Sequence, residues 1–196
     1  MLLINVEIKG RTSLLMNRFT EEAEIKVSSG ISSAVKPKSK LSPREQARKK
    51  AYADQDGNLY IPGPNIFACL IQAGSFLKTG KRSVTTQKSS LIPAGVSLLD
   101  IVCCLDTKEF EVDSRSVVIP STGGRIMCHR PRLDSWSCGF TLEVDDCMFH
   151  EDFVRELVEC AGSRVGLGDY RPARKGPFGK FGISSWSAEK VEVAAA

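Results

Sequence analysis

Apolar and polar residues follow regular patterns along several stretches of the chain. Positions 2–9 and 136–144 alternate with a period of two, which is typical of a strand that buries one face. Apolar residues spaced along 178–186 predict a last strand. Residues 97–105 (SLLDIVCCL) are instead almost continuously apolar, and such a run predicts a central strand that is buried on both faces.

Two other stretches, 66–77 and 151–161, place apolar residues at helical spacing. The second has acidic residues near its start and is followed by Gly162, which we expect to be the C-cap. A shorter helix over 43–52 is marked by a capping box that begins at Ser42. This short helix has little apolar surface, so we interpret it as a peripheral insertion.

Two short strands, 116–119 and 125–129, flank a turn-forming segment and predict a hairpin. Without inserted segments the elements follow the order β–α–β–β–α–β. This order predicts an α+β protein with a ferredoxin-like (RRM-like) core, in which two helices cover one face of an antiparallel four-stranded sheet. We expect a single domain over 1–196. Its insertions are a basic segment with a small helix at 10–63, a basic loop at 79–96 and the hairpin at 106–135.

Composition supports a folded protein. The chain has 196 residues, of which 42% are hydrophobic, and a net charge of +4. These values exclude disorder for most of the chain and favour one domain with a sizeable core. No run approaches the roughly 18–20 apolar residues of a membrane span, and the first residues resemble no secretion signal. We therefore expect a cytoplasmic protein with no membrane partner.

Seven cysteines are spread along the sequence without regular spacing. An odd number without a C-x-x-C pair argues against both a disulfide framework and a structural zinc site. Cys138 and Cys160 fall on apolar faces, and we interpret them as small buried hydrophobic residues. We expect neither a metal nor another cofactor.

The small net charge conceals four basic segments. They are 36–50, 78–88, 125–132 and 164–180, with net charges of +6, +4, +3 and +4. One such segment would be typical of a solvated loop, but four on an otherwise acidic chain indicate a surface that binds a polyanion, and we favour nucleic acid. In the first three segments, the cations expected to contact RNA are Lys36, Lys38, Lys40, Arg44, Arg48, Lys49, Lys50, Lys81, Arg82, Lys88, Arg125, Arg130 and Arg132.

The fourth basic segment contains a glycine loop (166–180) between the second helix and the last strand. Gly166, Gly168, Gly176 and Gly179 would let its backbone pass close to a ligand, although they could equally serve turns. The loop matches neither a Walker A nor a Rossmann glycine motif. Its expected phosphate contacts are Arg171, Arg174, Lys175 and Lys180, and the rings available to stack on bases are Tyr170 and Phe178.

Three segments resemble the RAMP superfamily of CRISPR-associated proteins, in particular the repeated backbone subunit of multi-subunit effector complexes. Ile61–Ile66 (IPGPNI), at the start of the first main helix, is similar to that family's IPGSSLKG helix start. Leu133–Phe140 (LDSWSCGF) resembles the part of its strand pair that precedes the second helix. Residues 166–181 (GLGDYRPARKGPFGKF) resemble its terminal glycine-rich loop and last strand.

The chain departs from that family in its short length and in Asn65 and Phe67, which replace small residues. The resemblance implies a subunit that oligomerises head-to-tail on guide RNA and holds its sugar-phosphate backbone, while base pairing reads a complementary target strand. Its other partners would be the remaining subunits of the effector complex. The departures leave a second interpretation open, namely an anti-CRISPR or phage accessory protein that mimics the subunit and docks on a host complex.

No spacing of reactive residues predicts a catalytic site. His129 lies in the predicted hairpin and His150 precedes the second main helix, and we interpret both as surface or packing residues. Asp54 and Asp56 stand beside an Asp-Gly turn, which explains them better than metal-dependent cleavage does. A metal-dependent endoribonuclease is therefore the weakest of three interpretations, and we expect no enzyme activity.

Overall fold

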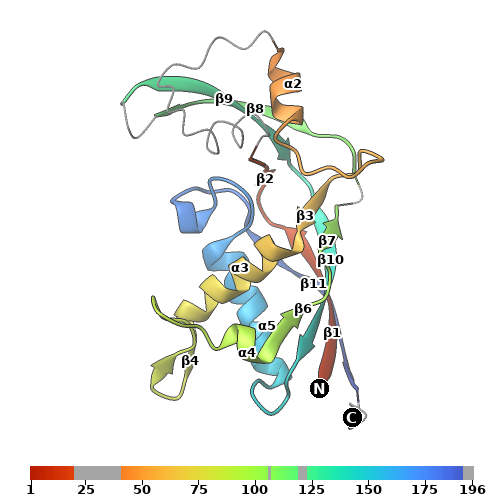
Figure 1. Cartoon of the computed structure of the whole chain (residues 1–196), viewed down its shortest axis with the longest axis vertical. Helices are drawn as coiled ribbons and strands as arrows, with labels where there is room; N and C mark the ends of the chain where they lie inside the picture. Colours follow the sequence, from red (N-terminus) through yellow and green to blue (C-terminus); the bar gives the residue numbers. More distant parts are fainter. Residues whose placement is uncertain (20–40, 106, 119–122, 192–196) are drawn as a thin grey trace, which may run out of the picture.

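The computed structural model describes residues 1–19, 41–105, 107–118 and 123–191. Its main sheet has the strand order β11 (Phe181–Lys190), β1 (Leu2–Gly10), β10 (Ser137–Val144) and β6 (Val96–Leu98), as seen in Figure 1. Each neighbouring pair of strands is antiparallel. The strands predicted at 2–9 and 136–144 are confirmed, whereas the last strand begins at Phe181 instead of 178.

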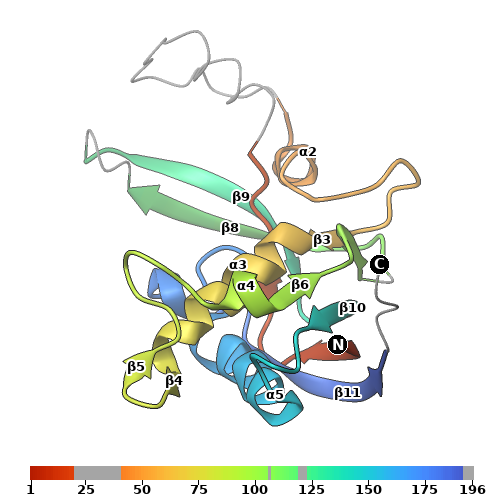
Figure 2. The ribbon, with the colours of Figure 1, turned by 60° about the horizontal axis from the view of Figure 1, so that its bottom comes forward.

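The main sheet has one covered and one open face. Ile4, Val6 and Ile8 of β1 are buried, while the residues that alternate with them are largely exposed, as the period of two predicts. Helices α3 (Gly63–Ala73) and α5 (Glu151–Cys160) pack over the buried face (Figure 2). The core of the protein therefore lies between this face and the two helices.

Helix α3 begins earlier and ends earlier than the apolar spacing predicts. It starts at Gly63 and gives way after Ala73 to a 3-10 turn over Gly74–Phe76. The following segment forms a small hairpin of β4 (Lys78–Thr79) and β5 (Arg82–Ser83), and then the short helix α4 (Ile92–Gly95).

A second sheet extends from one end of the core. It contains β2 (Leu14–Leu15), β9 (Arg125–Leu133) and β8 (Glu111–Val118), in that order. Strands β8 and β9 form the predicted hairpin, which is longer than expected and projects away from the core in Figure 1. Residues 119–122, which stand between the two strands in the sequence, lie outside the described residues.

Helix α2 (Pro43–Arg48) packs against this hairpin. Its predicted capping box is confirmed, because the Ser42 hydroxyl accepts a hydrogen bond from the Glu45 backbone N–H and the Glu45 carboxylate accepts one from the Ser42 N–H. The helix ends at Arg48 and not at 52. Lys36, Lys38 and Lys40 precede it and lie outside the described residues.

The prediction of one central strand over 97–105 is wrong. The segment divides into β6, at an edge of the main sheet, and β7 (Val102–Cys104), which pairs with β3 (Tyr60–Pro62). Between them, the Asp100 carboxylate accepts a hydrogen bond from the Thr141 backbone N–H at 2.6 Å. At this position a side chain, and not a backbone carbonyl of the segment, pairs with β10. Ile101 is consequently 78% exposed.

Gly162 does not end helix α5. The chain continues through a π-helical turn, Ala161–Val165, and stops at Gly166, whose φ of 75° is in the left-handed region. Gly162 is buried against β11, where a Cβ atom would lie 2.3 Å from the Phe181 carbonyl oxygen. The glycine is therefore explained by close packing and not by a helix cap.

The protein is thus a mixed α/β protein whose described residues form four α-helices and several antiparallel sheets. None of the seven cysteines, all of which are among the described residues, forms a disulfide, and Cys138 and Cys160 are buried as predicted. Among the helices that the structure describes, none has the length and apolar character needed to cross a membrane.

Candidate nucleic-acid interface

The glycine loop meets the β2 segment and the start of α3 at the junction of the two sheets. Its backbone is fixed from both ends, because Gly179 N–H donates to the Ser13 carbonyl oxygen at 2.8 Å and Asp169 N–H donates to that of Leu15 at 2.8 Å. From beneath, the Cys69 thiol of α3 donates to the Gly166 carbonyl oxygen at 3.3 Å. Burial raises the pKa of this thiol to about 12, so it stays protonated and able to donate at neutral pH.

The glycines of the loop are required by the loop's own packing. Gly168 and Gly179 have φ values of 74° and 71°. A Cβ atom would lie 2.4 Å from the Leu15 carbonyl oxygen at Gly168 and would overlap the Leu167 carbonyl oxygen at Gly179. At Gly176 it would overlap the Tyr170 carbonyl oxygen. The structure thus supports their role in turns, and a close approach to a ligand stays a prediction.

Ionic contacts hold the base of the β8–β9 hairpin against the loop. Arg130 of β9 lies with its Nε 2.8 Å from Asp169 Oδ2, and the Arg130 side chain is only 11% exposed. The Asn17 amide donates to the same carboxylate oxygen at 3.1 Å. Because its side chain is largely buried and paired with Asp169, Arg130 holds the hairpin against the loop, and its contact with an RNA phosphate stays a prediction.

A second contact between hairpin and loop involves a cation and an aromatic ring. Arg115 of β8 donates from Nε to the buried Asp113 carboxylate at 2.8 Å, and its guanidinium lies 4.8 Å from the centre of the Phe178 ring. Phe178 in turn lies 6.1 Å from the ring of Tyr170, which is 42% exposed. The two predicted stacking rings are therefore adjacent, and Arg115 is a neighbour that sequence reasoning missed.

The remaining predicted cations divide into paired and solvated groups. Arg44 pairs with Glu109 at 3.3 Å, Arg132 pairs with Asp134 at 2.9 Å, and the Lys50 ammonium donates to Cys128 Sγ at 3.0 Å. Lys49 is exposed, whereas Arg171 and Lys180 are half-buried. Arg171 Nη1 donates to the Gly168 carbonyl oxygen at 2.9 Å. Exposed side chains without an ionic or hydrogen-bonding partner among the described residues are those of Arg48, Lys81, Arg82, Lys88, Arg125, Arg174 and Lys175.

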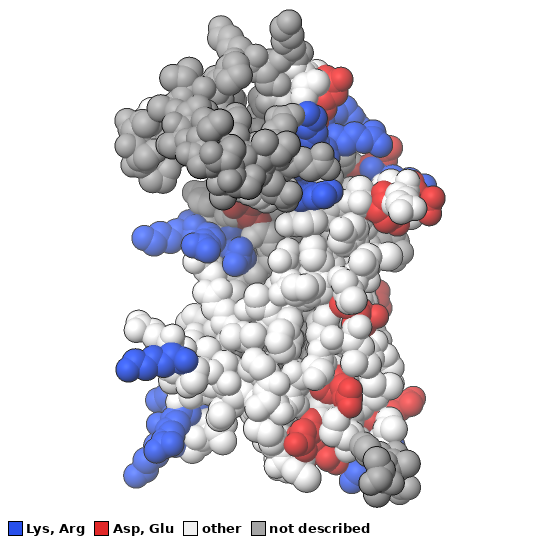
Figure 3. Space-filling model, in the orientation of Figure 1, with Lys and Arg blue, Asp and Glu red and all other residues white. Residues whose placement is uncertain are grey.

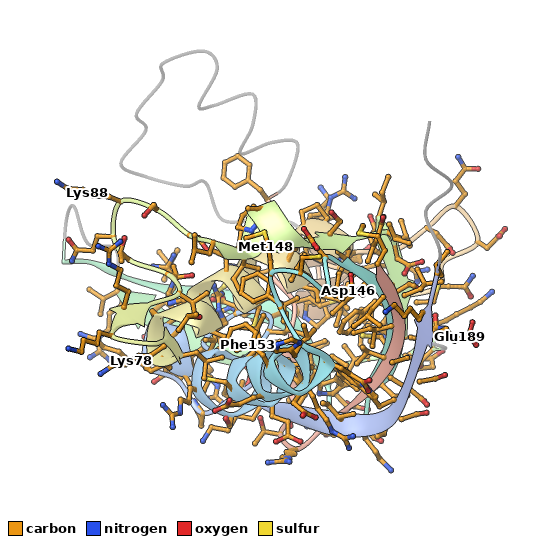
Figure 4. The ribbon with its side chains drawn as sticks, turned by 90° about the horizontal axis from the view of Figure 1, so that it is seen from below. Lys78, Lys88, Asp146, Met148, Phe153 and Glu189 are labelled. Atoms are coloured by element: carbon orange, nitrogen blue, oxygen red, sulfur yellow. The ribbon has the colours of Figure 1, made fainter. Side chains whose placement is uncertain are left out.

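Charges of opposite sign occupy opposite sides of the core. In the lower half of Figure 3, Lys and Arg lie mainly along the left edge, and Asp and Glu lie mainly along the right edge. Seen from below in Figure 4, Lys78 and Lys88 of the 78–88 segment lie on the side away from Asp146 and Glu189. The basic side is the one that carries β4, β5 and the glycine loop in Figure 1.

The open face of the main sheet is poorly suited to stack bases. RRM proteins bind RNA there through aromatic side chains. In this chain Phe140 and Phe181 are buried under the helices, and Trp186 donates from its indole N–H to Glu151 of α5. Most residues that line the shallow groove on the open face are small and polar or acidic, and the aromatic residue among them is the buried Phe140. A nucleic acid is therefore better accommodated on the side of the glycine loop.

A cavity of about 260 Å³ opens between the glycine loop, the β2 segment and the start of α3. Its walls include Tyr52, Tyr60, Asn65 and Arg171. The two tyrosines come from the segment that leads into α3, so residues more than a hundred positions apart in the sequence line one space. No sequence pattern predicts this arrangement, because each tyrosine alone is an ordinary half-buried aromatic residue.

Two of the candidate catalytic residues, Asp54 and His129, have hydrogen-bonding partners in the structure. The Asp54 carboxylate accepts hydrogen bonds from the Asn58 side chain and from two backbone N–H groups of its own turn, and these bonds lower its pKa. His129 Nδ1 lies 2.7 Å from the Ser114 hydroxyl across the β8–β9 pair, and His150 precedes α5 as its N-cap. Their arrangement matches the turn and surface roles expected for them.

One further acidic group stands at the opposite end of the main sheet. Ligand atoms of Asp145, Asp146 and Cys147 lie within 4.8 Å of one another. The Asp146 carboxylate is 3.0 Å from the amino group of Met1 and 3.6 Å from the Lys190 ammonium, so its charge is already compensated. Nothing else in the described residues points to a cation there.

Neither models of known protein families nor characterised proteins match this chain. Its function must therefore be argued from its own residues.

Proposed function

We propose that this chain is an RNA-binding protein that serves as the guide-RNA-binding backbone subunit of a CRISPR-type ribonucleoprotein. The proposal joins the resemblance of three segments to the RAMP superfamily with the geometry around the glycine loop. The observation that carries it is the convergence of that loop with the start of α3 and the base of the β8–β9 hairpin. Two of the three similar segments, at 61–66 and 166–181, line the same space.

A ferredoxin-like core is part of the proposal. Helix α3 connects β1 to β6, and α5 connects β10 to β11, while β10 lies between β1 and β6. This agrees with two split β–α–β units in one antiparallel sheet, the arrangement expected from the order of elements. The β4–β5 hairpin is inserted between α3 and β6, and the β8–β9 hairpin is inserted between β6 and β10.

RNA would follow the basic side of the core. Arg174 and Lys175 project from the glycine loop without ionic partners among the described residues, and Tyr170 and Phe178 stand beside them. Exposed cations and rings of this kind hold a single strand through its phosphates and its base faces. Seven cysteines without a disulfide among them suit a reducing compartment, and a cytoplasmic location is therefore part of the proposal.

The first experiment is to purify the protein without added nuclease and to measure its mass and absorbance ratio before and after RNase. A large particle that contains RNA of discrete length and disassembles with RNase is the expected result. Arg174→Ala/Lys175→Ala should reduce RNA content, and Arg155→Ala/Lys190→Ala, which removes two exposed cations of α5 and β11 outside the four basic segments, is the control of equal charge change. Equal RNA content in both variants would remove the glycine loop from the interface.

The second candidate function is an accessory protein that docks on a host complex. It is favoured by an exposed apolar corner, where Leu99, Ile101 and Val102 are 50%, 78% and 47% exposed. A nucleic-acid-free monomer in the same experiment would support it over the RNA-assembled subunit.

A further inference from the structure

The cavity beside the glycine loop has the form of a small-molecule site. Its volume of about 260 Å³ lies just below the ~300–1,000 Å³ of sites for drug-sized ligands, so it suits a group as small as one heterocycle. Leu14 and Met16, which are 1% and 3% exposed, form an apolar lining. Polar groups, among them Asn65 and Arg171, complete the wall.

Two tyrosine rings line one side of the cavity. Their centres are 5.9 Å apart and their planes are inclined by 57°. The Tyr60 backbone N–H donates to the Tyr52 carbonyl oxygen at 3.1 Å, which fixes the two residues relative to each other. Within the part of the chain that the structure describes, neither phenol hydroxyl has a hydrogen-bond partner, so both are available to a ligand.

The glycine loop supplies another part of the wall, and hydrogen bonds and an ion pair hold this part in place. Asp169 Oδ2 is engaged by Arg130 and Asn17, while Oδ1 accepts a hydrogen bond from the Tyr170 N–H at 2.9 Å. Arg171 uses one of its nitrogens, Nη1, to hold the Gly168 carbonyl oxygen and keeps its other N–H donors. The free N–H donors of Arg171 and the amide of Asn65 therefore give the cavity both hydrogen-bond donors and acceptors, next to flat apolar surfaces.

We propose that this cavity receives one unpaired nucleobase of the bound RNA. The base lies against the ring of Tyr52 or Tyr60, and its polar edge meets Asn65 and Arg171. The inference rests on the proposed function, because it needs a strand whose phosphates lie near Arg174 and Lys175, the exposed cations of the same loop. That charge favours RNA over an apolar side chain of a protein partner as the occupant.

The test compares two single-stranded probes of equal length and charge, oligouridylate and the same backbone without bases. Base stacking and edge contacts should make the wild-type protein bind oligouridylate about tenfold more tightly. Tyr60→Ala should reduce this preference, leaving the part that Tyr170 and Phe178 contribute, whereas Tyr60→Phe should keep stacking and reduce it less. Asn65→Ala alters an exposed side chain and is a second variant that leaves the core intact. Phe76→Ala, an exposed aromatic residue elsewhere, is the matched control.

A direct readout locates the base. RNA that contains 4-thiouridine should crosslink on irradiation to peptides that contain Tyr52, Tyr60 or Asn65, as mapped by mass spectrometry. Crosslinks confined to Tyr170 and Phe178, together with unchanged probe preference in Tyr60→Ala and Asn65→Ala, would overturn the proposal and leave RNA binding by the loop intact. Loss of self-association in Tyr60→Ala with unchanged RNA affinity would assign the cavity to a protein side chain and overturn it as well. Failure of the wild-type protein to bind either probe would instead refute the proposed function and, with it, the nucleobase site.

Discussion

The β4–β5 and β8–β9 hairpins both belong to basic segments of the sequence, but their cations differ in whether they have ionic partners in the structure. In β4–β5 and the turn that follows, Lys78, Lys81, Arg82 and Lys88 are all exposed and lack ionic partners among the described residues. In β9, by contrast, Arg130 is buried against Asp169, and Arg132 pairs with Asp134. The net charge of a segment therefore says little about how many of its cations can reach a ligand, because that depends on acids brought near by the fold.

The largest effect is expected from removing the buried cation of the β8–β9 hairpin. Arg130→Ala leaves the Asp169 carboxylate without its main partner in a half-buried place, and we expect the free energy of unfolding to fall by about 3 kcal/mol. Urea denaturation measures this loss. Arg130→Ala/Asp169→Ala should recover part of it, and a double variant no more stable than the single one would contradict the pair's role.

A smaller loss is expected at the other contact between hairpin and loop. Arg115→Ala removes the hydrogen-bonding partner of Asp113, which is only 5% exposed, together with the contact to the Phe178 ring. We expect a loss of about 1–2 kcal/mol in the free energy of unfolding. Arg115→Lys keeps the charge but not the planar guanidinium, so an equal loss in both variants would indicate that planarity matters.

The thiol under the glycine loop predicts a pH effect of intermediate size. Burial raises the pKa of Cys69 from 9.0 to about 12, so the unfolded chain releases this proton at a lower pH than the folded protein. The corresponding stability is fully present below pH 9 and is lost as pH rises towards 12, by up to about 1.4 kcal/mol per pH unit. Unfolding curves of wild type and Cys69→Ala between pH 8 and pH 10 should converge as pH rises, and parallel curves would exclude this cause.

The smallest effect on stability is expected at the solvated hairpin. Lys81→Ala/Arg82→Ala removes two exposed cations, so the free energy of unfolding should change by less than about 0.5 kcal/mol. If RNA extends to β4–β5, the slope of log affinity against log salt should become shallower by about 1.4, that is, about 0.7 for each phosphate contact on a single strand. An unchanged slope would confine the RNA to the glycine loop and the β8–β9 hairpin.

Local patterns predicted the local parts of this structure. The alternation in β1 and the capping box at Ser42 depend on neighbours in the sequence, and both are confirmed. The prediction of one strand over 97–105 is wrong because the path of this segment depends on a hydrogen bond between Asp100 and Thr141, which lie far apart in the sequence. An apolar run shows that burial of the segment is favourable, but it does not show which strands the segment will pair with.

The same limit applies to the candidate site. Composition alone predicts the glycine loop as a candidate site, and Gly166, Gly168 and Arg171 of this loop line the cavity at the junction. The pairing of Arg130 with Asp169 and the approach of Tyr52 and Tyr60 to that loop were not foreseen. Each involves an ordinary residue whose role appears only when the chain brings distant segments together, and neither periodicity nor spacing reports such contacts.

Lys175 stands in the left-handed conformation, with φ 60° and ψ 29°, at the end of the 3-10 turn Pro172–Arg174. Glycine would adopt this conformation more easily, so the lysine costs the protein some stability. Selection of random variants for heat resistance alone should therefore enrich glycine at 175, whereas selection for retention of RNA should enrich lysine. The residue found at position 175 would thus distinguish selection for stability, which favours glycine, from selection for RNA binding, which favours lysine.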